Sequence, residues 1–133
     1  MSDQQPRTGG INHVNLVVSD LDRSVAFYRA ALGFEDAGTG SGITFMRTPG
    51  AADLLALQPA SGDLDRLAGK ERTPGDSGGV DHIGFAVESP AMIDLLVQRV
   101  QDHGGSLLWR TENAQGDASA VVTDPDGYVL QLG

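Results

Sequence analysis

The chain has 133 residues, 40% hydrophobic and 20% charged, so it is long enough to bury one hydrophobic core. Nine Lys and Arg oppose 18 Asp and Glu, and this net charge of −9 argues against partners such as nucleic acid or an anionic membrane surface. The absence of cysteine excludes disulfide scaffolds, zinc fingers and thiol nucleophiles. No apolar run reaches the roughly 18 residues of a membrane-spanning helix. Residues 1–10 are polar, which predicts a flexible tail without a signal peptide and a cytoplasmic protein.

Residues 11–18 and 80–87 form an internal repeat. Six of the eight aligned positions are identical or both apolar, and His13 aligns with His82. Both segments are rich in Val, Ile and Phe, which predicts a strand in each. In the first strand, alternation places His13 on one face and Val14, Leu16 and Val18 on the other.

A helix is expected after each of these strands. In the first, Ser19 or Asp20 is the expected N-cap, and Gly33 is expected to end the helix. In the second, Ser89 is the expected N-cap with Pro90 at the first helical position. Apolar residues recur at helical spacing in both segments: Leu21, Val25, Tyr28 and Leu32 in the first, and Ile93, Leu96, Val97 and Val100 in the second.

Three short strands are expected after each helix. They span about 34–37, 43–47 and 53–58 in the first half, and about 106–111, 118–123 and 128–132 in the second. Residues 124–127, with the sequence DPDG, predict a tight turn before the last strand. Each half therefore has the order β-α-β-β-β, in modules 11–60 and 80–133. The connector 61–79 is rich in Gly, Asp and Ser, with a helical turn expected near 64–67.

Two βαβββ halves with a histidine in each first strand resemble the vicinal oxygen chelate superfamily, which includes glyoxalase I, extradiol dioxygenases, fosfomycin-resistance enzymes and bleomycin-resistance proteins. The matching motifs are residues 13–21, 27–28, 32–34, 81–87 and 124–128, and the resemblance runs from about Ile11 to the C-terminus. It implies an α+β fold in which the two modules form a cupped, mostly antiparallel eight-stranded sheet with the helices outside. It also implies a homodimer, and leaves open whether the modules pair within or between chains.

The resemblance also implies a metal site. Ligands in metal-dependent members come from the first and fourth strands of each module, so His13, His82 and Gln131 are the expected ligands, and Ala56 occupies the remaining position. Many members have a carboxylate where this chain has Gln131. Imidazole and amide ligands suit Fe, Mn, Ni, Co or Zn, and a site without metal is the alternative.

The missing carboxylate has chemical consequences. A divalent ion held by neutral ligands keeps its full charge, which favours a small oxygen-chelating substrate. The ion would act as a Lewis acid or as a template. Glyoxalase I and epimerase activities need a carboxylate base, so they are disfavoured against lyase, dioxygenase or transferase reactions.

The candidate residues for contact with a substrate surround the expected ligands. By strand alternation Asn15 and Gln58 share a face with His13 and Ala56. Arg47 is a candidate for binding an acidic group, although an exposed Arg is the commoner case. Trp109 is either part of the core or part of the cavity wall. The full set is Asn15, Ala56, Gln58, Arg47 and Trp109.

Other interpretations remain open at this point. The histidines also suit a metal-free protein that binds small molecules, as bleomycin-resistance proteins do, and the acidic surface would attract a cationic drug. A regulatory or structural subunit with a remnant site is a third interpretation. His103 is near the end of the second helix, where a cation favours the helix dipole, so it is not a candidate ligand.

Overall fold

The computed structural model describes residues 5–60, 73–76, 78–112 and 114–133. In chain order its elements are β1 (Val14–Val18), α1 (Leu21–Leu32), β2 (Glu35–Gly40), β3 (Ile43–Arg47), β4 (Leu55–Pro59), β5 (Ile83–Phe85), α3 (Pro90–Asp102), β6 (Ser106–Glu112), β7 (Ala118–Thr123) and β8 (Val129–Leu132). Both halves have the predicted order β-α-β-β-β. The helical turn expected near 64–67 lies outside the described residues.

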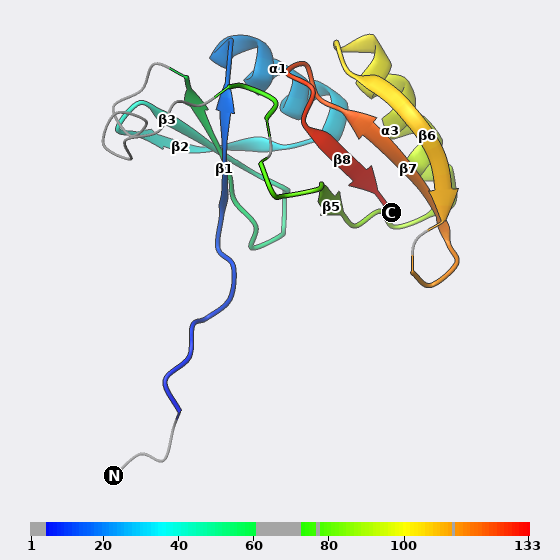
Figure 1. The fold of residues 1–133 in the computed structure, drawn as a ribbon, viewed down its shortest axis with the longest axis horizontal. Coiled ribbons are helices and arrows are strands. Elements are labelled where there is room, and N and C mark those ends of the chain that lie inside the picture. Colours follow the sequence, from blue (N-terminus) through cyan, green and yellow to red (C-terminus); the bar gives the residue numbers. More distant parts are fainter. Residues whose placement is uncertain (1–4, 61–72, 77, 113) are drawn as a thin grey trace.

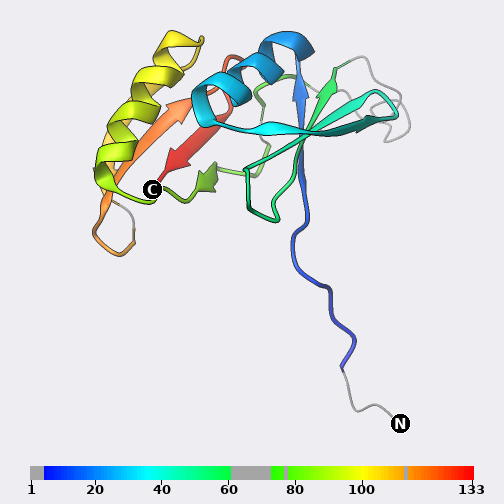
Figure 2. The same ribbon diagram turned by 180° about the vertical axis from the view of Figure 1, so that it is seen from behind.

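The eight described strands form two four-stranded sheets of the same topology (Figure 1). Sheet A has the order β1-β4-β3-β2 and sheet B has the order β5-β8-β7-β6. In each sheet the first strand pairs in parallel with the fourth, and the remaining pairs are antiparallel. The two described helices, α1 and α3, lie behind the sheets, as the reverse view shows (Figure 2). The predicted α+β fold is confirmed, with hydrogen bonding dividing its eight strands into two sheets.

Local capping explains where the helices begin and end. The Asp20 side chain accepts a hydrogen bond from the Arg23 amide at 3.0 Å, and Gly33 closes α1 with a left-handed φ of 77°. Ser89 caps α3, and Pro90 occupies its first turn as predicted. His103 follows the last turn of α3. Neither described helix is long and apolar enough to span a membrane.

The first strand of each module is shorter than predicted. β1 begins at Val14 and β5 at Ile83, so His13 and His82 immediately precede the strands. In the first module the fourth strand sets this limit, because Val14 pairs with Leu55, the first residue of β4, and a ladder cannot extend beyond its partner strand. In the second module the pairing begins one residue inside β8, where Ile83 pairs with Leu130.

One continuous core joins the two modules. It contains buried residues of α1 and sheet A (Leu16, Val18, Phe27, Tyr28, Ala31, Phe34, Met46, Leu55 and Leu57) and of α3 and sheet B (Ile93, Val97, Val100, Ala120, Val122, Tyr128, Leu130 and Leu132). Phe34, after α1, meets Phe85 of β5 edge to face, with ring centroids 5.7 Å apart. Because α1 and α3 pack against each other, the helices close the rear of the molecule and leave the opposite sheet faces open.

A buried carboxylate links the modules within this core. Asp124 is 2% exposed and begins the predicted turn before β8. Its side chain accepts hydrogen bonds from the Tyr28 hydroxyl of α1 at 2.8 Å and from the backbone amides of Asp126 and Tyr128 at 2.9 and 3.0 Å. These three bonds satisfy a group that would otherwise be costly to bury, and they join α1 to the last turn.

Two further contacts join this turn to β1. The Tyr128 hydroxyl donates to the carbonyl oxygen of Val17 at 2.6 Å, and Asp126 accepts from the backbone amide of Ser19 at 3.3 Å. Arg23 of α1 pairs with Asp126 at 3.2 Å. Together with Asp124 and Tyr28, these residues form what we call the inter-module clasp.

Burial shifts the protonation equilibria of the clasp. Desolvation raises the pKa of Tyr28 well above its ordinary value, and the neighbouring Asp124 carboxylate raises it further. Desolvation also raises the pKa of Asp124, while the hydrogen bond from Tyr28 opposes that shift.

We predict that Asp124→Ala destabilises the protein by roughly 3 kcal/mol, because it leaves several buried donors without an acceptor. The control is Asp36→Ala, which removes an exposed carboxylate paired with Arg29 and costs about 1 kcal/mol or less. Urea denaturation measures both. Equal losses in the two variants would show that Asp124 does not hold the modules together.

The raised pKa of Tyr28 predicts a pH dependence. An unfolded chain releases the tyrosine proton near about pH 10, whereas the folded protein retains it to higher pH. The stability that protonated Tyr28 contributes to the folded state is therefore complete below about pH 10, and it is lost as the pH rises further. Tyr28→Phe should make the free energy of unfolding fall less steeply as the pH rises above about 10. An unchanged slope would contradict this origin of the alkaline loss.

Candidate functional site

The two repeated histidines have matching local geometry. Nδ1 of His82 lies 2.7 Å from an Asp81 carboxylate oxygen, and Nδ1 of His13 pairs with the side-chain oxygen of Asn12. Because both partners are oxygen acceptors, Nδ1 carries the proton in each neutral ring, and the lone pair is on Nε2. Metal-ligating histidines are commonly oriented in this way.

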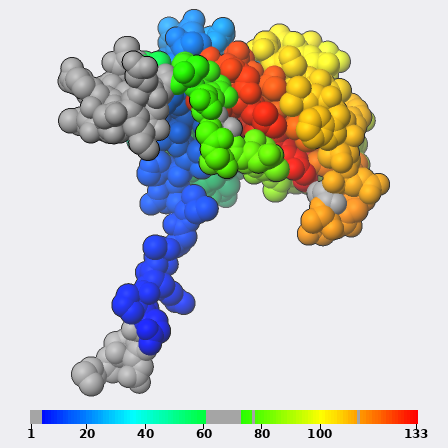
Figure 3. Space-filling view, in the orientation of Figure 1, coloured from blue at the N-terminus to red at the C-terminus, as the bar shows by residue number. Residues whose placement is uncertain are grey.

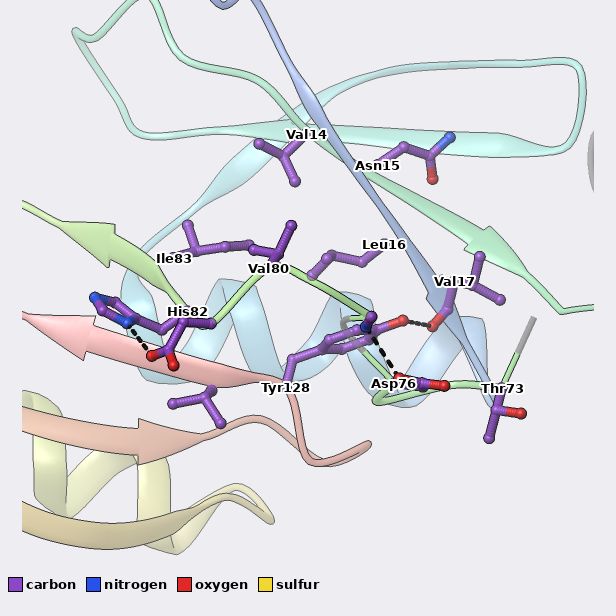
Figure 4. A pocket seen from close by; sticks show the side chains of 13 residues that line it. Val14, Asn15, Leu16, Val17, Thr73, Asp76, Val80, His82, Ile83 and Tyr128 are labelled. Carbon is purple, nitrogen blue, oxygen red and sulfur yellow. Dashed lines mark hydrogen bonds and ion pairs between the residues drawn. The ribbon is translucent and has the colours of Figure 1, made fainter.

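The two histidines line different cavities. His82 lines a cavity of about 560 Å³ between β1 and the segment that leads into β5 (Figure 4). His13 lines a smaller cavity of about 170 Å³, together with Phe34 and Phe85. Its ring stands edge-on to Phe45 of β3, with centroids 6.5 Å apart. In the described part of the chain, these two cavities therefore do not bring the imidazoles together.

The larger cavity runs along the free edge of β1. The Val14 amide donates a hydrogen bond to the Leu54 carbonyl oxygen, and the Val18 carbonyl oxygen accepts one from the Ala60 amide, each at 3.2 Å. The backbone groups of Val14 and Val18 therefore face β4. By alternation the backbone groups of Asn15 and Val17 point to the opposite edge, which pairs with no described strand. Most of the remaining wall is apolar, from Leu16, Val80, Ile83 and Val129, with Thr73, Asp76 and Asp81 adding polar groups.

Tyr128 forms one end of this cavity, where its hydroxyl binds Val17 (Figure 4). Burial raises the pKa of Tyr128, and the nearby Asp124 charge raises it further, while a hydrogen bond from the Gly75 backbone opposes the shift. The hydroxyl therefore keeps its proton and serves as a donor. It holds the wall of the cavity in place.

Gln131 projects from the face of sheet B that is opposite the core. Its neighbours Leu130 and Leu132 are buried in the core, so alternation places Gln131 on the open face. Its Nε2 donates to Ser119 at 3.0 Å, and the Ser119 hydroxyl donates to the Leu132 carbonyl at 3.1 Å. Because the amide nitrogen is held by buried Ser119, Oε1 is the atom left for a ligand or an ion.

In sheet A the corresponding position is Ala56, which is fully buried between Asn15 and Phe45. It supplies no donor atom. Beside it the Asn15 amide donates to Oε1 of Gln58 at 3.0 Å. The predicted placement of Asn15 and Gln58 on one face agrees with this contact.

The two remaining sequence candidates differ in availability. Arg47 is half-exposed and pairs with Glu35 at 2.9 Å, so binding an acid would require it to leave that partner. Trp109 is in register with Val121, which is in register with Gln131. Residues directly opposite in antiparallel strands share a face. Trp109 is therefore on the open face and not in the core.

The described residues bring together no group of three His, Asp, Glu or Cys side chains that could hold a metal ion. His13 and His82 line different cavities in the described part of the chain, so they and Gln131 are not gathered around one cavity there. Sequence reasoning missed the roles of Asn12, Asp81 and Tyr128. The first two occupy the same repeat position, immediately before each histidine, and this pairing was the available signal.

Comparison with known proteins agrees with the fold. The chain is 26% identical over 125 residues to the metallothiol transferase FosB of Shouchella clausii, covering 92% of this chain and 78% of that one. It is 24% identical to a manganese-dependent 2,3-dihydroxybiphenyl 1,2-dioxygenase of Geobacillus genomosp. 3, covering 90% of this chain but only 35% of that enzyme. The solved structure of hypothetical protein SA1046 from S. aureus matches with a TM-score of 0.78 at 23% identity, covering 96% and 94% of the two chains.

The family comparison covers nearly the whole chain. The sequence model of one superfamily matches residues 10–132, which include both βαβββ modules and both repeated histidines. The matching topology of sheets A and B agrees with this assignment. The chain therefore belongs to the Glyoxalase/Bleomycin resistance protein/Dioxygenase superfamily.

Proposed function

We propose that this protein is a metal-dependent enzyme that acts on a small oxygen-chelating substrate. The observation that supports this most is the matched orientation of His13 and His82, each with Nδ1 on a neighbouring oxygen and Nε2 free to ligate. Gln131 would supply an oxygen ligand through Oε1. When bound, a divalent ion would act as a Lewis acid or as a template for substrate oxygens. Among the relatives, FosB is named a metallothiol transferase and the dioxygenase is named manganese-dependent.

The residues fit such an ion by their donor chemistry. Two imidazole nitrogens and one amide oxygen suit Fe, Mn, Ni, Co or Zn, and they leave the ion's charge uncompensated. Ala56, at the remaining position, is fully buried and supplies no ligand atom. Since neither Ala56 nor Gln131 can accept a proton as a carboxylate does, reactions that need a base at these positions remain disfavoured.

We further propose that the site is assembled in a homodimer. His13 and His82 line different cavities in one chain, so His13 of one copy would join His82 and Gln131 of a second. Each cavity is lined by an exposed apolar residue. Ile11, which lines the His13 cavity, is 92% exposed, and Val80, which lines the His82 cavity, is 58% exposed. Residues 5–13 extend away from the body of the molecule and offer a surface to a second copy (Figure 3).

A metal-free binding protein is the second candidate. The observation that favours it is the cavity of about 560 Å³, which is lined mainly by apolar residues and has the size of a small-molecule site. With a net charge of −9 the protein would attract a cationic ligand. In this case His82 would be a polar group of the cavity wall.

The first experiment is metal loading of the purified, untagged protein with Fe(II), Mn, Co, Ni and Zn, followed by elemental analysis. We expect about one tightly held ion per chain, because each chain contributes one His13, one His82 and one Gln131. His13→Ala and His82→Ala should each lose the ion. His103→Ala is the matched control, because His103 lies at the end of α3, and it should retain the ion.

Failure to retain any ion under any loading would refute the metal-dependent function and favour the binding protein. Retention in His82→Ala would refute the ligand assignment.

Mixing the two histidine variants tests the shared site. After denaturation and refolding of His13→Ala with His82→Ala in equal amounts, a heterodimer would contain one site with both histidines and one with neither. Random pairing then restores about a quarter of the wild-type metal content. A site built within one chain would restore none, and that result would contradict assembly between copies.

A further inference from the structure

The first strands of the two sheets lie on opposite sides of one gap. The cavity of about 560 Å³ is lined in part by residues 14–17 and 80–83 (Figure 4), and the cavity of about 170 Å³ in part by residues 11–14 and 83–85. Early residues of one segment are therefore beside late residues of the other, so β1 and β5 run in opposite directions. We call the edges that they turn toward each other the inner edges.

The gap between the inner edges is wider than the spacing of paired strands. β1 and β5 belong to separate sheets, and most Cα–Cα distances between them exceed 8 Å. Hydrogen-bonded strands are about 4.8 Å apart, so the inner edges do not pair with each other in this arrangement. A further strand between them would need a gap of about 10 Å.

Both inner edges present unpaired backbone groups. On β1 these are the amide and carbonyl of Asn15 and the amide of Val17, whose carbonyl binds Tyr128. On β5 they belong to Gly84, because the Phe85 carbonyl faces β8 and accepts from the amide that follows β8 at 2.9 Å. These groups bond to no described residue, so they are available to another chain.

The neighbouring side chains leave these backbone groups accessible. The Asn15 side chain is held within sheet A by Gln58 at 3.0 Å, and Gly84 has no side chain. Val14 and Ile83 line both cavities and alternate with Asn15 and Gly84, so they form an apolar floor on the core side of the gap.

The outer edges of the two sheets are protected against pairing, and the inner edges are not. β2 contains two acidic residues and a bulge after Asp36, and β6 contains Arg110, Glu112 and a bulge after Leu107. Charged residues and bulges are common means of preventing a strand edge from pairing with another chain. The strands VNLVV of β1 and IGF of β5 contain no charge, no proline and no bulge. The protein therefore leaves its inner edges able to accept a strand.

Carboxylates restrict the chemistry of a chain that enters the gap. Asp76 and Asp81 line the larger cavity and Asp53 lines the smaller one, whereas no Lys or Arg is among the described lining residues. Asp53 is occupied by the amide and hydroxyl of Thr48 at 2.8 and 2.7 Å. The side chain of Asp81 is 94% exposed beside His82. Basic side chains suit these surroundings, and acidic ones do not.

We propose that the inner edges bind an extended peptide with basic side chains, which forms a further strand between β1 and β5. Its backbone pairs with Asn15 and Val17 on one side and with Gly84 on the other. Its apolar side chains lie over the apolar floor, and its basic side chains alternate with them toward Asp76 and Asp81. This inference goes beyond the proposed metal-dependent function and requires no metal.

Calorimetric titration of the full-length, metal-free protein with the peptide acetyl-KVKVK-amide tests the proposal. We expect saturable binding of one peptide per chain. Methylation of the two valine amide nitrogens removes the donors toward one inner edge and should weaken binding about tenfold or more. The peptide acetyl-EVEVE-amide should also bind about tenfold more weakly or less. Absence of saturable binding, or equal affinity for the methylated peptide, would overturn the proposal.

Hydrogen exchange of ¹⁵N-labelled protein locates the bound peptide. The amides of Asn15, Val17 and Gly84 should exchange about tenfold more slowly or less when the peptide acetyl-KVKVK-amide is bound, because each acquires an acceptor or is covered. Amides of the outer strands β2 and β6 should be unchanged. Slower exchange confined to β2 or β6 would overturn the assignment to the inner edges.

Variants test the charge and the edge separately. Asp76→Asn combined with Asp81→Asn should weaken binding of acetyl-KVKVK-amide about tenfold, whereas Asp22→Asn, on α1 behind the sheets, should change it less than about twofold. Asn15→Pro removes an inner-edge donor without removing a bond to β4, and it should also weaken binding. Equal effects of the double variant and Asp22→Asn would overturn the role of the carboxylates. If Asn15→Pro does not fold, the methylated peptide tests the same hydrogen bonds in the unaltered protein.

A second copy of this chain is the alternative occupant of the gap. In that case peptide affinity would fall as the protein concentration rises, and light scattering would show that the peptide dissociates dimers; this result would overturn the proposal. Metal loading separates the peptide site from the proposed function. Peptide binding by a protein that retains no ion would refute the metal-dependent function alone, and ion retention without peptide binding would refute the peptide site alone.

Discussion

The buried carboxylate of Asp124 is the interaction on which the arrangement of the two modules depends. Each module alone has a sheet with one apolar face, and only the shared core covers both. Asp124 fixes how the modules meet, because its carboxylate accepts hydrogen bonds from the Tyr28 hydroxyl of the first module and from two backbone amides of its own turn. A buried charge tolerates little change in its partners, so the clasp defines one relative orientation of sheets A and B.

That orientation determines where the candidate site can form. Tyr128 and Asp126 hold the end of β1 through Val17 and Ser19, and the Tyr128 contact lies on the edge of β1 that faces the segment entering β5. The resulting cavity contains His82 but not His13. The same contacts therefore stabilise the fold and accompany the placement of the two histidines in different cavities, which is the basis for proposing a site shared between two copies.

Much of the fold followed from local rules. The repeat around His13 and His82, the caps at Asp20 and Ser89, and the turn that begins at Asp124 were enough to predict two βαβββ modules, because each depends on neighbouring residues. The surroundings of the candidate site residues were harder to predict from the sequence. The face occupied by Trp109 depends on a bulge that the sequence does not mark, and the separation of the histidines depends on the clasp between modules. The engagement of Arg47 by Glu35 is likewise a cross-strand contact.

The central claim about function is that the two repeated imidazoles ligate one ion. X-ray absorption spectroscopy of the zinc- or cobalt-loaded protein tests it most directly, because imidazole rings give distinct outer-shell scattering. Two imidazole nitrogens with the remaining ligands oxygen are predicted, falling to one imidazole in His13→Ala protein loaded at high metal concentration. A coordination shell of oxygen atoms alone, or one unchanged by His13→Ala, would contradict the account.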